Sequence, residues 1–127
     1  MHLLFTQLPM FQRQGAPAYK ANLEATKRVC RMLGNPEKHL KFVHVAGTNG
    51  KGTVSHMLAA AFQLSGHKVG LFSSPHLVDF RERIRVNGQC IPESAVVEFV
   101  QQWQANEGWG TPSFFELTFG LALVHFQ

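Results

Sequence analysis

The feature that most constrains this chain is a glycine-rich segment between an apolar run and a helical repeat. Residues 42–46, Phe-Val-His-Val-Ala, are aromatic and β-branched, which predicts a buried strand. Residues 47–53, Gly-Thr-Asn-Gly-Lys-Gly-Thr, follow directly, and apolar residues then recur at helical spacing from Val54 to Leu64. Gly66 ends this predicted helix, and residues 69–72, Val-Gly-Leu-Phe, predict a second strand.

A strand, a helix and a second strand in this order form a βαβ unit, whose strands are typically parallel. The sequence therefore predicts an α/β fold in which helices flank a parallel sheet. The other predicted elements are a helix from Pro17 to Gly34, a hairpin over residues 84–91 that turns at Asn87-Gly88, a helix after Pro92 with Val96, Val97, Val100 and Trp103 on its apolar side, and a helix that starts at Thr111-Pro112 and runs to the end of the chain.

The last of these helices is apolar nearly all round, so we expect it to need cover on several sides. Two or three strands cannot supply that cover. We therefore interpret residues 1–127 as the N-terminal portion of one larger domain, with the rest of the protein beyond residue 127.

Composition and charge exclude several classes of function. The 127 residues carry a formal net charge of +4, which suits an anionic ligand, but no Lys/Arg run of the kind that binds nucleic acid is present. No apolar stretch is long enough to span a membrane, and Pro9 follows the short apolar start too closely for a signal peptide. Cys30 and Cys90 lack metal-ligand spacing and are interpreted as reduced thiols. We expect a cytoplasmic protein with no nucleic-acid or membrane partner.

The segment Gly47, Thr48, Asn49, Gly50, Lys51, Gly52 and Thr53 has the chemistry of a phosphate-binding loop. Glycines allow a tight turn whose N–H groups face an anion, and the helix that follows adds its free N–H groups and dipole. Lys51 is placed to reach the β- and γ-phosphates of ATP. The general pattern G-x-x-x-x-G-K-[ST] is only partly matched, because Val45 and Gly52 stand at its first and last positions. The alternative is a glycine-rich turn that only packs a helix on a sheet.

These residues, with His44-Val45-Ala46 before them, resemble the phosphate loop of folylpolyglutamate and dihydrofolate synthases, members of the Mur ligase superfamily. A second block, residues 70–77 and 80–88, resembles the Ser-Pro-His turn and Glu-Arg-Ile segment of the same enzymes, and residues 114–118 resemble the Phe-Glu start of their next helix. The resemblance implies the N-terminal portion of a Mur-ligase-like central ATPase domain.

The resemblance also implies roles for individual residues. Residues 47–53 would hold ATP, with Lys51 as the catalytic cation, and Ser74 with Thr53 would bind Mg²⁺. The side chains that would line the dihydropteroate or folate site are His76, Arg83, Phe114, Phe115 and Glu116. Ordinary alternatives remain for several of them: a turn serine for Ser74, core packing for the two phenylalanines, and a structural ion pair of Arg83 with Glu82 or Glu116.

The implied reaction is ATP-dependent amide ligation. ATP phosphorylates a carboxylate of dihydropteroate or folate, and the amine of L-glutamate attacks the acyl phosphate. The family's remaining metal ligands, its modified lysine and its C-terminal domain would lie beyond residue 127, so residues 1–127 alone are expected to be inactive, and the full-length enzyme to be a monomer. The alternatives are another ATP-dependent enzyme, such as a Mur-type ligase or a small kinase, and a nucleotide-binding module without catalysis.

Overall fold

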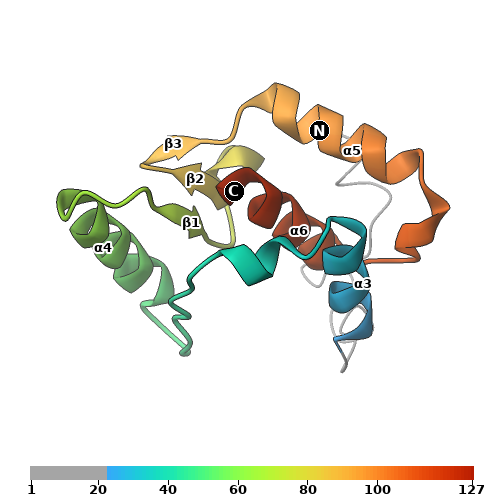
Figure 1. The fold of residues 1–127 in the computed structure, drawn as a ribbon. Helices are drawn as coiled ribbons and strands as arrows, with labels where there is room; N and C mark the ends of the chain where they lie inside the picture. Colours follow the sequence, from blue (N-terminus) through green and yellow to red (C-terminus); the bar gives the residue numbers. More distant parts are fainter. Residues whose placement is uncertain (1–22) are drawn as a thin grey trace. The chain divides into compact units, whose positions relative to one another are not determined.

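The computed structural model describes residues 23–127, and the helix start predicted near Pro17 lies outside them. The described residues form two compact units (Figure 1). Residues 23–39 and 94–125 belong to the first unit, and residues 40–93 belong to the second. Each unit has its own buried side chains, and the phosphate-loop segment lies in the second.

The first unit is a set of three helices. They are α3 (Glu24–Met32), α5 (Glu93–Gln104) and α6 (Phe114–Phe126), with short 3₁₀ helices at Pro36–His39 and Glu107–Trp109. Val29 of α3 and Leu117 of α6 are almost fully buried. The rings of Phe99 and Trp109 meet edge to face, with their centroids 5.6 Å apart. This unit therefore has an aromatic and aliphatic core in which each helix takes part.

Two helices differ from the sequence prediction in detail. In α5, Val96 is buried as predicted, but Val97 is exposed and Phe99, which the prediction omitted, is buried. Helix α6 starts at Phe114 instead of Thr111, because Ser113 is its N-cap. Ser113 and Glu116 satisfy each other's backbone N–H groups in a capping box, and this pair outweighs the preference for proline in a first turn.

Helix α6 is covered on most of its sides by the described residues. Leu117, Leu121 and Leu123 are each no more than 3% exposed. Gly120 accounts for part of this cover, because a Cβ atom there would lie 2.5 Å from Val29 and 3.1 Å from Leu33 of the α3 region. The absence of a side chain lets the two segments approach closely. The described residues therefore bury most of the apolar surface of α6, whereas Phe115 and Val124 are 52% and 40% exposed.

The second unit combines a helix with a small sheet. Its elements are α4 (Lys51–Leu64), β1 (Gly70–Phe72), a 3₁₀ helix at Phe80–Arg83, β2 (Ile84–Val86) and β3 (Gln89–Cys90). The strands pair in the order β1-β2-β3, and α4 contacts β1. The predicted hairpin is confirmed: Arg85 pairs with Cys90, and Asn87 and Gly88 take positive φ values of 49° and 80° at the turn.

The predicted parallel pair of strands is wrong for the described residues. β1 pairs with β2 in antiparallel register, Leu71 opposite Arg85, and residues 42–46 form no strand. Phe42 and Val43 are 55% and 64% exposed. A strand needs a neighbour for its backbone hydrogen bonds, and none of residues 23–127 pairs with this segment. The β-branched composition of residues 42–46 favours a strand, but a strand forms only where a neighbouring strand is available to pair with it.

Helix α4 is the element whose apolar stripe stays uncovered. None of its residues is buried, and Val54, Met57 and Leu64 are 46%, 67% and 91% exposed. The sequence correctly predicted the helix and its termination near Gly66, but the stripe faces no core in the described residues. None of the helices in residues 23–127 has both the length and the apolar content needed to cross a membrane.

Cys30 and Cys90 are both free thiols, in agreement with the prediction from the sequence. Cys30 is buried in α3, and burial together with the nearby Glu37 carboxylate raises the pKa of its thiol to about 11. Cys90 is exposed on β3.

The close approach at Gly120 yields a stability prediction. We expect Gly120→Ala to lower the free energy of unfolding by about 1–3 kcal/mol, because the added methyl overlaps the stiff Val29 side chain. Chemical denaturation would measure the change. Val124→Ala, on an exposed face of the same helix, is the control. A Gly120→Ala variant as stable as the wild type would show that the packing at this point is loose.

Candidate nucleotide-binding site

The glycine-rich loop ends at an open helix N-terminus. Gly50 is the N-cap of α4 and has left-handed backbone angles, φ 75° and ψ −1°. A residue with a Cβ would be strained there, which explains the glycine. No side chain caps the helix, and the first helical N–H to find a partner within it is that of Val54, which donates to the Gly50 carbonyl at 3.0 Å.

The N–H groups of the first turn, residues 51–53, therefore have no partner within the helix. The first turn of α4 also contains no acidic residue, so no side-chain charge offsets the positive end of the helix dipole. The loop is exposed along its whole length. This end of α4 thus has the accessibility and polarity needed for an anion such as a phosphate group.

Lys51 lies over the loop that precedes it. Its Nζ donates to the carbonyl oxygens of Gly47 at 2.5 Å and Thr48 at 3.3 Å. An ammonium group has three donors, so one remains for a ligand while two hold the loop. One turn further along, Nδ1 of His56 lies 2.8 Å from the Gly52 carbonyl, which can only accept, so this nitrogen carries the proton.

The turn that contains Ser74 follows β1 directly and belongs to the same unit as the loop. Ser74 is exposed and precedes Pro75 through a cis peptide bond. The backbone N–H of Ser73 donates to the Arg83 carbonyl at 3.0 Å, which joins the start of the turn to the end of the 3₁₀ helix.

His76 and Arg83 form a direct side-chain contact. Nε of Arg83 donates to Nδ1 of His76 at 2.7 Å, so Nδ1 is the acceptor and the neutral ring carries its proton on Nε2. Burial and the neighbouring guanidinium of Arg83 both lower the pKa of His76. Arg83 is only 4% exposed, and burial lowers its pKa too. The alternative considered from the sequence, an ion pair of Arg83 with Glu82 or Glu116, is not formed among residues 23–127.

Glu82 holds the rest of the turn. Its carboxylate accepts the backbone N–H groups of Leu77 and Val78, each at 3.0 Å, and of Asp79 at 2.7 Å. Asp79 in return caps the 3₁₀ helix, so the two residues form a capping box. Hydrogen bonds to the ionised form stabilise it, and they lower the pKa of Glu82.

Sequence reasoning assigned no role to Glu82 beyond a possible ion pair. The signal was present, because Asp79-x-x-Glu82 has the residue types and spacing of a capping box.

The three predicted site residues of α6 lie in the first unit and differ in exposure. Phe114 is buried at 4% exposed, whereas Phe115 is 52% exposed. The Glu116 carboxylate accepts the Ser113 N–H at 2.7 Å and the Thr26 hydroxyl at 3.4 Å. Of the three, Phe115 has the ring most accessible to a ligand, and Glu116 has an evident structural role as a helix cap.

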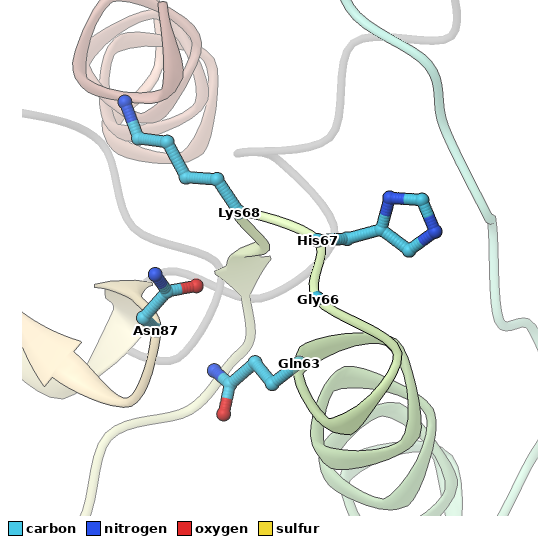
Figure 2. Close-up of a pocket in the computed structure, with 5 residues that line it drawn as sticks. All are labelled: Gln63, Gly66, His67, Lys68 and Asn87. Atoms are coloured by element: carbon cyan, nitrogen blue, oxygen red, sulfur yellow. The ribbon is translucent and has the colours of Figure 1, made fainter.

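A shallow depression of about 430 Å³ lies at the other end of α4 (Figure 2). It is lined by Gln63, Gly66, His67, Lys68 and Asn87. The Asn87 side chain is already committed, since its Oδ1 accepts the Val69 N–H at 2.9 Å. The depression follows the C-terminal end of the helix, whose dipole favours cations, so it is not the phosphate site.

Comparisons with known proteins show which proteins resemble this chain in sequence and in structure. A probable bifunctional folylpolyglutamate synthase/dihydropteroate synthase of Haloferax volcanii is 42% identical over 113 residues, which are 85% of this chain and 14% of that protein. The structure of Escherichia coli FolC in complex with DHPP and ADP matches with a TM-score of 0.80 and 35% identity, over 98% of this chain and 28% of that one. This chain is a relative of the folylpolyglutamate and dihydrofolate synthases.

A third match is the structure of a bifunctional folylpolyglutamate synthase/dihydrofolate synthase with Mn, AMPPNP and L-glutamate bound, with a TM-score of 0.75 and 36% identity over 85% of this chain and 27% of that one. The resemblance inferred from residues 44–53 and 70–88 is thereby confirmed. The chain spans about a seventh to a quarter of the length of these synthases. No family model matches it.

The described residues offer hydroxyl oxygens for a metal ion. No group of three or more His, Cys, Asp or Glu side chains in residues 23–127 is arranged to hold one. Mg²⁺ keeps several waters and binds substrate phosphates alongside few protein oxygens. Ser74 and Thr53, both exposed in the second unit, fit that donor chemistry as single ligands beside a nucleotide.

The hydrogen bonds to Glu82 predict a pH dependence. Because the folded pKa of Glu82 lies below the ordinary glutamate value of 4.5, its carboxylate stabilises the turn above pH 4.5. This effect is lost as the pH falls through the lower folded pKa. We expect the Leu77 and Val78 amide NMR shifts to titrate with an apparent pKa below 4.5. Glu82→Gln should abolish that titration. A wild-type midpoint at or above 4.5 would contradict the bonding.

Proposed function

We propose that this chain contributes the phosphate-binding part of an ATP-dependent, Mg²⁺-dependent amide ligase that joins L-glutamate to dihydropteroate or folate. The observation that carries the proposal is the open N-terminus of α4, preceded by the glycine loop and Lys51. The relatives add the substrate class: one solved structure holds DHPP and ADP, and another holds Mn, AMPPNP and L-glutamate.

In this proposal the loop residues Gly47 to Thr53 bind the ATP phosphates through first-turn N–H groups. Lys51 turns from the Gly47 and Thr48 carbonyls toward the γ-phosphate, where its charge lowers the repulsion between two anions, the phosphate and the substrate carboxylate. Bound Mg²⁺ would supply further charge neutralisation, with Ser74 and Thr53 as its protein oxygens. The substrate carboxylate attacks the γ-phosphorus and ADP leaves, which gives an acyl phosphate. The amine of glutamate then attacks the acyl carbon, and phosphate and a proton are released as the amide forms.

On the substrate side, exposure favours Phe115 as a surface on which a flat heteroaromatic ring can stack. His76 is partly exposed and is the second candidate. Arg83, Phe114 and Glu116 are buried, so we propose that they support the site through His76 or through the helix start.

We further propose that residues 1–127 are the N-terminal portion of the ATP-binding domain. The uncovered stripe of α4 and the exposed Phe42 and Val43 support this, since a finished domain buries such surfaces. The small share of each relative that the chain matches supports it as well.

The first test is nucleotide binding. We expect Lys51→Met to weaken ADP or ATP affinity by roughly tenfold or more, because a charge-assisted contact to phosphate is lost. Isothermal titration calorimetry measures the change. Lys68→Met, at the opposite end of α4, is the matched control and should bind as the wild type does. Equal affinity of the Lys51 and Lys68 variants would reject the phosphate-loop assignment.

The second test concerns catalysis. The purified 127-residue chain, supplied with ATP, Mg²⁺, dihydropteroate and L-glutamate, is expected to release no phosphate above background, because it matches only 28% and 27% of the length of two solved synthases. E. coli FolC serves as the positive control. Substrate-dependent turnover by this chain would refute the proposal that further parts of the domain are required.

A further inference from the structure

The turn around Ser74 is not held in place by packing. Ser74 and Pro75 are exposed, and Leu77 and Val78 are each 91% exposed. A loop with so little buried surface is expected to sample several conformations unless polar contacts fix it. A metal ligand in such a loop would have to be ordered each time the metal binds.

Within residues 23–127, the 3₁₀ helix Phe80–Arg83 makes several polar contacts to this turn. The Arg83 carbonyl accepts the Ser73 N–H, and the Arg83 side chain donates to His76, so the two residues that bracket Ser74-Pro75 are tied to one residue. Glu82 takes the next three backbone N–H groups, those of Leu77, Val78 and Asp79.

The element that supplies these contacts is itself anchored. Phe80 and Arg83 are 2% and 4% exposed, and Ile84, which follows at the start of β2, is fully buried. The ring of Phe80 also meets that of His76 edge to face, with centroids 6.3 Å apart. A rigid, buried segment therefore sets the conformation of an exposed turn.

We propose that Glu82 and Arg83 are positioning residues that hold the Ser74 hydroxyl in place for the metal of the nucleotide complex. Both side chains are engaged within the protein: the Glu82 carboxylate accepts three backbone N–H groups, and the buried Arg83 donates from its Nε to His76. This role differs from the substrate-binding role predicted for Arg83 from the sequence. It rests on the proposed function, because it assigns the metal to Ser74.

The sharpest test separates metal-dependent from metal-independent binding. ADP affinity of the chain is measured by calorimetry with Mg²⁺ and with EDTA, for the wild type, Glu82→Gln and Glu98→Gln. Gln keeps the size of the side chain but replaces one acceptor oxygen with an NH₂ donor. That donor would face a backbone N–H, so at least one hydrogen bond would be lost. Glu98, exposed on α5, is the matched control for the same change.

We expect Mg²⁺ to strengthen ADP binding by the wild type and by Glu98→Gln, and Glu82→Gln to reduce that strengthening by roughly five- to tenfold. Affinity in EDTA should be the same in all three proteins, since the phosphate loop is unchanged. An undiminished Mg²⁺ effect in Glu82→Gln, or an equal loss with and without metal, would overturn the positioning role. No ADP binding by the wild type would instead reject the proposed function.

Hydrogen exchange of the wild type tests the same inference without a variant. The amides of Leu77, Val78 and Asp79 should exchange more slowly than expected for residues this exposed, because each donates to Glu82. Exchange as fast as in an unstructured peptide would show that the contacts do not order the turn, and would overturn the inference even if the variant failed to fold.

Discussion

The constraint on which this structure depends is the need of helix-start N–H groups for acceptors. Three helix starts in residues 23–127 meet it with side chains: Asp79 and Glu82 at Phe80–Arg83, Asn106 at Glu107–Trp109, and Ser113 and Glu116 at α6. The start of α4 does not, because Gly50 has no side chain and the first turn carries no acid. Of the α-helices in residues 23–127, α4 is the one without an acidic residue in its first turn.

The same constraint explains why Glu82 and Glu116, which lie close to candidate site residues, have a structural role as helix caps. Glu82 and Glu116 each follow a capping serine or aspartate by three residues, and each is held by backbone N–H groups. A carboxylate in that position orders the residues before it at the cost of its own availability to a ligand. Phe115 and Ser74, which neighbour these caps, remain exposed. Each cap thus fixes the backbone beside it within its own unit.

Elements with local signals were predicted well. The Asn87-Gly88 turn, the helix between Lys51 and Leu64, and the strand at residues 70–72 all follow from short-range patterns. Errors arose where a partner had to be guessed. Residues 42–46 have strand composition but no pairing neighbour within residues 23–127, and the sequence did not indicate that α4 would have no buried residue. Burial and pairing depend on residues far apart in the chain, which periodicity does not report.

The sequence by itself determined the glycine-rich loop and the family resemblance, because the backbone conformation of the loop depends on glycines and a lysine within seven residues. Tertiary structure alone decided which of the neighbouring arginines is buried and which lies near the surface. Arg83 lies in a row with Arg81 and Arg85, yet Arg83 is buried against His76, while Arg81 pairs with Asp79 at 2.8 Å near the surface. That difference comes from the direction in which the Phe80–Arg83 turn faces the core, and the order of residues does not specify it.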